Sequence, residues 1–121
     1  MRLANEEKFL IELIFNNNLA VKKICNLDLE NLIKISSSHL IIPLLYSKIK
    51  LNKCEKLFPD DFIKYIKEIY VINRNRNSIL SDEINQISTL LKKNNLNHIF
   101  LKGFAMLKCE YYNDIGERMI G

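Results

Sequence analysis

Apolar residues recur every three or four positions along most of this chain, and short polar stretches separate the runs. This spacing predicts a helix over residues 5–16, a second helix that begins at Asp28, and a third with Pro43 in its first turn. After a short connection over residues 51–58, the same spacing continues over residues 60–94. An unbroken helix of that length would be about 50 Å long.

The middle of the long helix, residues 73–78, reads Asn-Arg-Asn-Arg-Asn-Ser and is polar on every face. A helix that packs on a core normally keeps an apolar stripe, so this turn predicts either a bend or contact with a polar partner. Asn73, Arg74 and Arg76 are candidates for lining a nucleotide or nucleic-acid groove, because arginine forks onto phosphate. The pattern alone favours a solvated helix turn.

The periodicity changes after residue 97. Residues 98–101, His-Ile-Phe-Leu, form a short apolar run before Gly103, which predicts a strand. Helical spacing returns after Gly103, and residues 112–116 are predicted to form a loop. A lone strand leaves backbone groups unpaired, and no second strong strand candidate precedes it. Its partner is therefore expected after residue 121 or on a second copy of the chain.

Composition supports a folded, mainly helical protein. The 121 residues are 48% hydrophobic and 26% charged, which suits one domain with a core, and 3 glycines and 2 prolines are few for an all-β fold. The net charge of +4 comes from basic residues interspersed with acidic ones, a pattern typical of solvated helices. It argues against a concentrated nucleic-acid-binding stripe.

Cysteine usage and the N-terminus indicate a cytoplasmic protein. Cys25, Cys54 and Cys109 are odd in number and widely spaced, with no histidine beside a cysteine pair, so neither a zinc site nor a disulfide framework is expected. The acidic N-terminal residues exclude a signal peptide. No apolar run reaches the roughly 18 residues of a membrane helix, so no membrane contact is expected.

Lys102 and Gly103 join the predicted strand to a helix, an arrangement that suits phosphate binding. Glycine lets the backbone approach a ligand, the helix start offers free N–H groups, and lysine adds a positive charge. Taken alone, these two residues favour a plain strand-to-helix turn with a solvated lysine.

Three short motifs near the C-terminus together resemble the signature of the uncharacterised bacterial nucleotidyltransferase-like family. They are Leu-Lys-Gly-x-Ala-x-Leu over residues 101–107, Tyr-Tyr at 111–112, and Gly-x-Arg-x-x-Gly over residues 116–121. Residues 39–46 and the long helix also resemble that family's N-terminal region, so the resemblance covers most of the chain.

The resemblance implies a mainly α (α+β) fold. A helical N-terminal region, residues 1–96, would lead into a truncated nucleotidyltransferase-like α/β unit, residues 97–121, within one continuous domain. It also implies transfer of a nucleotidyl group from a nucleoside triphosphate to an unknown acceptor, with magnesium. Lys102 and Gly103 are the implied phosphate contacts, and Arg118 is implied to steady phosphates or the metal-binding acids.

In that family an Asp-x-Asp pair would follow where this sequence ends. We therefore expect no catalysis from this chain by itself, and only weak phosphate binding. Asp114 and Glu117 lie near the motif but lack the alternate-residue spacing that puts two carboxylates on one face of a strand. A supporting role at the site is the most that we expect of Glu117.

A non-enzymatic function is the alternative. The chain would then be a helical interaction module that binds a partner or forms a homodimer, through the strand edge or the long helix.

Overall fold

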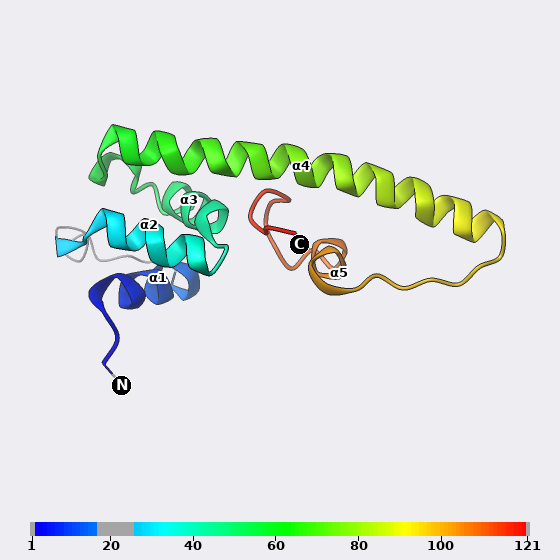
Figure 1. Ribbon diagram of the computed structural model, residues 1–121, viewed down its shortest axis with the longest axis horizontal. Helices are drawn as coiled ribbons and strands as arrows, with labels where there is room; N and C mark the ends of the chain where they lie inside the picture. The colour runs from blue at the N-terminus through cyan, green and yellow to red at the C-terminus, as the bar shows by residue number, and fades with distance from the viewer. Residues whose placement is uncertain (1, 17–25, 121) are drawn as a thin grey trace.

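The computed structural model describes residues 2–16 and 26–120, and within these residues the chain is mainly helical (Figure 1). Its elements are α1 (Asn5–Phe15), α2 (Leu29–Ser38), α3 (Ile42–Leu51), a 3₁₀ turn (Glu55–Leu57), α4 (Asp60–Lys93) and α5 (Lys102–Lys108). The predicted helical class is therefore confirmed. The strand predicted at 98–101 is not formed, and no α/β unit appears in the described residues.

Helices α1, α2 and α3 pack together with the first half of α4 and form a helical body at one end of the molecule (Figure 1). Helix α3 makes its most extensive contacts with α4. The periodic apolar positions meet in one core, which consists of Phe9, Leu10, Leu13, Leu32, Ile42, Leu45, Tyr46, Ile49, Cys54, Phe58, Phe62 and Ile66. Burial of this shared core, rather than helix propensity alone, holds these four helices together.

Helix α2 begins where the sequence predicts. The Asp28 carboxylate accepts a hydrogen bond from the Asn31 backbone N–H at 3.2 Å and caps the helix. A second carboxylate, that of the buried Glu6 on α1, accepts from the Asp28 backbone N–H at 3.0 Å and from Asn31 Nδ2 at 3.1 Å. The start of α2 is thus tied to α1 by charge-assisted hydrogen bonds.

Four helices end at a left-handed residue that is not glycine. Leu40, Lys53, Asn95 and Glu110 follow α2, α3, α4 and α5 with φ between 54° and 57°. At each end, the N–H of the following residue donates to a carbonyl five residues back, which is the Schellman arrangement. A left-handed non-glycine residue costs roughly 1–2 kcal/mol, so the fold carries strain at ends where glycine would carry none.

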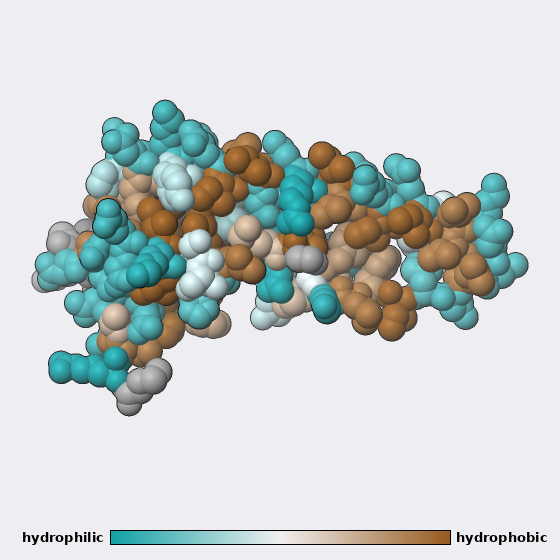
Figure 2. All heavy atoms as spheres, in the orientation of Figure 1, coloured by the Kyte–Doolittle hydropathy of each residue, from teal (hydrophilic) through white to brown (hydrophobic). Residues whose placement is uncertain are grey.

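Helix α4 continues past the helical body, and the segment after it returns alongside α4 to reach α5 (Figure 1). This part exposes several large apolar side chains, and Figure 2 shows apolar surface over it. They are Ile72, Ile79, Ile87, Leu90, Leu96, Ile99 and Leu101. The distal half of α4 carries apolar residues at the predicted helical spacing, but many of these side chains are exposed in the described chain.

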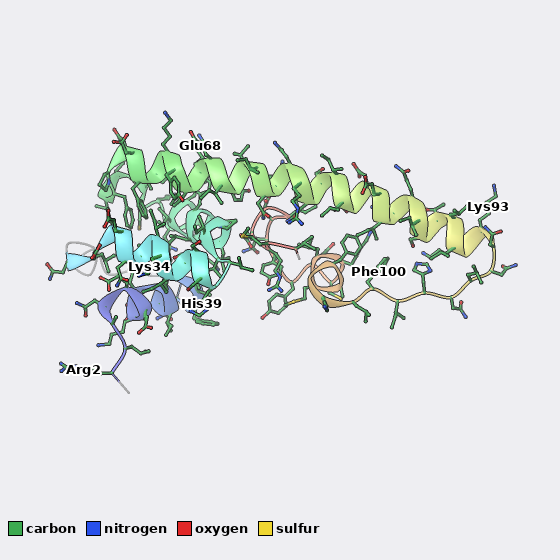
Figure 3. All side chains as sticks on the ribbon, viewed as in Figure 1. Arg2, Lys34, His39, Glu68, Lys93 and Phe100 are labelled. Atoms are coloured by element: carbon green, nitrogen blue, oxygen red, sulfur yellow. The ribbon has the colours of Figure 1, made fainter. Side chains whose placement is uncertain are left out.

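Residues 97–101 keep the alternation of a strand without its hydrogen-bond ladder. His98 Nε2 lies 2.6 Å from Ser88 Oγ on α4, and the Phe100 ring packs edge-on against Phe104 (Figure 3). Ile99 is 81% exposed on the opposite side. The strand prediction fails because a strand needs a neighbouring extended segment, and the described chain provides none.

Two further observations concern the described thiols and helices. Cys54 and Cys109 are free, whereas Cys25 lies outside the described residues. Among residues 2–16 and 26–120, no helix is both long enough and apolar enough to span a bilayer.

Candidate functional site

The polar turn in the middle of α4 faces the chain's own C-terminal loop, residues 112–120 (Figure 1). Asn73 is 4% exposed, and its Nδ2 donates to the carbonyl oxygens of Gly116 at 2.8 Å and Arg118 at 3.0 Å. Helix α4 runs unbroken through this turn. Of the two alternatives that the sequence leaves open, contact with a polar partner is correct.

Asn77 lies one helical turn further on and is fully buried. Its Nδ2 donates to the carbonyl oxygens of Ile115 at 2.7 Å and Arg118 at 2.6 Å. Arg76 Nη1 donates to the Ile120 carbonyl oxygen at 2.6 Å. The buried amides of this turn therefore bind the backbone of the loop, whereas Arg74, Asn75 and Arg76 remain exposed beside it.

Asp114 is the electrostatic anchor of the loop. Its Oδ1 accepts hydrogen bonds from Tyr70 Oη and from the Gly116 backbone N–H, both at 2.7 Å, and Arg74 Nε lies 3.5 Å from Oδ2. Burial alone would raise the pKa of Asp114, but these hydrogen bonds and the Arg74 charge together lower it below its ordinary value of 3.8. Burial, followed by the bond to Asp114, raises the pKa of Tyr70 to about 12.

These shifts predict that the loop is released in acid. A lowered carboxyl pKa contributes stability that is present above pH 3.8 and is lost as pH falls through the folded-state pKa of Asp114. Tyr70→Phe removes a hydrogen bond that lowers this pKa, so an NMR titration should find the Asp114 pKa higher in that variant. Tyr65→Phe, on an exposed position of the same helix, is the control and should leave the titration unchanged. Equal titrations in both variants would contradict the assignment.

Glu117 joins the loop to the helical body. It is 4% exposed, its Oε1 accepts a hydrogen bond from Ser47 Oγ on α3, and its Oε2 accepts from the Asn113 backbone N–H at 3.2 Å. Both carboxylate oxygens therefore have protein donors. In this structure Glu117 holds the loop against α3.

Gly103 and Arg118, two of the three residues implied by the family resemblance, lie side by side. A Cβ atom at Gly103 would lie 3.3 Å from Arg118 Nε, so the missing side chain makes room for the guanidinium. Arg118 Nε is buried without a hydrogen-bond partner, and Nη1 lies 3.4 Å from Tyr112 Oη. A buried donor without an acceptor is unfavourable, and Arg118 Nε–H is left as such an unsatisfied donor.

Lys102 supplies the turn in a way that the sequence does not predict. The lysine, not the glycine, adopts the left-handed backbone conformation, with φ 53°. Its side chain is exposed. The value of Gly103 is thus the space it leaves beside Arg118, and not its conformational freedom.

Arg118 also lines a hollow of about 110 Å³ between the loop and the α2–α3 connection. Tyr112, Met119, His39 and Leu44 contribute to its walls. A second hollow of about 270 Å³ lies between α4, α5 and the loop, and Lys108 and Asp114 line it. The loop thus contributes residues to two separate hollows. Lys102 lines neither hollow.

A family model described as "Uncharacterised nucleotidyltransferase" matches residues 26–121. The chain belongs to this family. No significant match was found among curated proteins or among solved structures. The match covers α2 to α5 and the C-terminal loop, so the Gly103–Arg118 pair and the polar turn of α4 both lie inside the family region.

The described residues of this nucleotidyltransferase-family chain do not fit a magnesium site. No group of three or more histidine, cysteine or acidic side chains comes together within residues 2–16 and 26–120. Asp114 accepts a hydrogen bond from Tyr70, and Glu117 accepts one from Ser47, so both carboxylates are engaged by protein donors. We assign no metal ligand to either residue.

Sequence reasoning singled out Asn73 but did not find its role, and it missed Tyr70 and Asn77, which also hold this chain's loop in place. Tyr70, Asn73 and Asn77 lie three and four residues apart, so the helical period puts them on one face of α4. That spacing is visible in the sequence. The partner is not, because these asparagines contact backbone carbonyl groups, which no side-chain pattern reveals.

Proposed function

We propose that this family member binds a nucleoside triphosphate and takes part in transfer of its nucleotidyl group to an acceptor. Arg118 is the principal phosphate contact in this proposal. The observation that supports it is the buried Arg118 Nε, which has no hydrogen-bond partner beside Gly103. Guanidinium groups bind phosphate oxygens through paired N–H donors, and an unpaired buried donor gains most from such a ligand.

The reaction expected of the family is a displacement at the α-phosphorus. An acceptor oxygen forms a bond to that phosphorus, the bond to the bridging oxygen breaks, pyrophosphate leaves, and the acceptor loses its proton. Arg118 would hold phosphate oxygens as charge develops on them. The exposed Lys102 would add a mobile positive charge at the same turn. Magnesium belongs to this expected chemistry, with ligands other than Asp114 and Glu117.

Calorimetric titration with ATP and with pyrophosphate tests the proposal. Arg118→Ala should weaken binding by roughly 10- to 100-fold, because a hydrogen bond to a charged group contributes about 1.5–3 kcal/mol. Lys102→Ala should weaken it by less than about fivefold, since an exposed ion pair contributes about 0.2–1 kcal/mol. The larger effect is therefore expected at Arg118.

Lys93→Ala is the matched control, since this lysine lies at the far end of α4 (Figure 3). Its affinity for ATP should equal that of the unaltered protein. The absence of saturable binding of either ligand, with magnesium in excess, would refute the proposed function. Equal losses in the Arg118 and Lys93 variants would remove Arg118 from the site.

A further inference from the structure

The Arg118 carbonyl oxygen is the point where the two amides of α4 meet. It accepts one hydrogen bond from Asn73 Nδ2 at 3.0 Å and another from Asn77 Nδ2 at 2.6 Å. The side chain of the same residue lies against Gly103, on the turn that begins α5. A single residue thus connects the middle of α4, through its backbone, to the candidate phosphate site, through its guanidinium.

We propose that Asn73 and Asn77 are positioning residues that hold Arg118 in the orientation needed to contact phosphate. The proposal rests on the proposed function in that Arg118 is taken as the phosphate contact. Neither asparagine touches the ligand, so each acts through Arg118. The pair is called the amide clamp below.

The geometry of the amide clamp accounts for the choice of asparagine. Each NH₂ group has two N–H donors, and all four donors of the pair are spent on the carbonyl oxygens of Ile115, Gly116 and Arg118. Asp has the same shape but, when ionised, donates nothing and places a negative charge against those oxygens. Both positions therefore require a side chain that donates hydrogen bonds, and a side chain of the same shape without donors does not suffice.

Burial makes the hydrogen bonds of the amide clamp difficult to replace. Asn73 is 4% exposed and Asn77 is 0% exposed, so water cannot replace a lost donor without opening the loop. The loop has other attachments, from Asp114 to Tyr70 on α4 and from Glu117 to Ser47 on α3, which keep it in place when the clamp is broken. Loss of the clamp should therefore loosen Arg118 without unfolding the helical body.

The test compares Asn73→Asp and Asn77→Asp with Asn75→Asp. Asn75 lies between them on the same turn, is exposed, and undergoes the same isosteric change. The first readout is hydrogen exchange of the Arg118 Nε–H in ¹⁵N NMR spectra, which needs no nucleotide. Exchange should speed up about tenfold or more in the two clamp variants, the factor expected for loss of one buried hydrogen bond of ordinary strength. It should not change in Asn75→Asp.

The second readout is ATP affinity, which should fall about tenfold or more in the clamp variants, in line with the looser Arg118. Circular dichroism should show that the helical body still melts as before. Lowering the pH from 7.5 to about 5 protonates the buried carboxyl of the new Asp side chain and restores a hydrogen-bond donor. The Nε–H exchange rate of the variant, divided by that of the wild type, should then move back toward one. A merely structural defect would not recover in this way.

The two hypotheses fail separately. If the wild type binds no ATP, the proposed function is refuted, and Nε–H exchange alone then tests the amide clamp. Unchanged Nε–H exchange in both clamp variants would overturn the clamp proposal, whatever their affinity for ATP. Faster exchange with unchanged ATP affinity in a protein that binds ATP would also overturn it, because Arg118 would then not need positioning. If Asn77→Asp fails to fold, Asn73→Asp decides the outcome.

Discussion

Replacing Ile66 with alanine should lower the free energy of unfolding of the helical body by about 2–5 kcal/mol, the range for buried Ile-to-Ala changes. Ile66 is 0% exposed and lies on α4 within the core that α1, α2 and α3 share. The variant loses the transfer free energy of three carbon atoms and leaves a cavity that packed neighbours cannot fully close. Urea denaturation followed by circular dichroism measures the loss.

Ile72→Ala is the matched control on the same helix. Ile72 is 69% exposed, so the same chemical change should alter the free energy of unfolding by no more than about 0.5 kcal/mol. Similar losses in both variants would mean that the exposed part of α4 is covered in solution, contrary to the described structure.

Gly116→Ala is expected to displace the C-terminal loop while the helical body stays folded. The added Cβ atom would lie 2.7 Å from Tyr70 Cε2, 2.9 Å from Arg74 Cβ and 2.9 Å from Asp114 Oδ1. Arg74 Cβ belongs to the helix framework and cannot move aside, so the loop must shift. Overpacking of this kind costs about 1–3 kcal/mol, which should appear as faster amide hydrogen exchange over residues 112–120.

Gly103→Ala provides the comparison. Its nearest neighbour would be Arg118 Nε at 3.3 Å, which lies toward the end of a flexible side chain, so the guanidinium can adjust. Loop protection should therefore fall less than in Gly116→Ala, while ATP affinity should fall through the displaced Arg118. Full amide protection of the loop in Gly116→Ala would show that the loop docks less closely than described.

The helical half of the fold could be predicted because its information is local. Leu45 and Ile49 on α3, and Phe62 and Ile66 on α4, are each four residues apart, and that spacing reports which face of each helix is buried. Asp28 and Pro43 mark helix starts by chemistry that acts within one turn. These predictions need no knowledge of distant segments.

The remaining features depend on partners far away in the chain. Residues 98–101 have the alternation of a strand, but a strand exists only when another segment supplies its hydrogen bonds. The polar turn of α4 indicates a polar partner, yet Asn73 binds a loop 43 residues away. Gly103 and Arg118 were paired as site residues only through the family resemblance, because no local rule brings them together.

The way the loop is held leaves its chemistry free to diverge. Asn73 and Asn77 bind carbonyl groups, and every amino acid has one, so the amide clamp places no demand on which side chains follow Ile115 or Arg118. Substitution of Met119, for example, changes the wall of the hollow without removing a single clamp hydrogen bond. Loop side chains can therefore be varied on an unchanged backbone, and directed evolution of this loop can start from the same freedom.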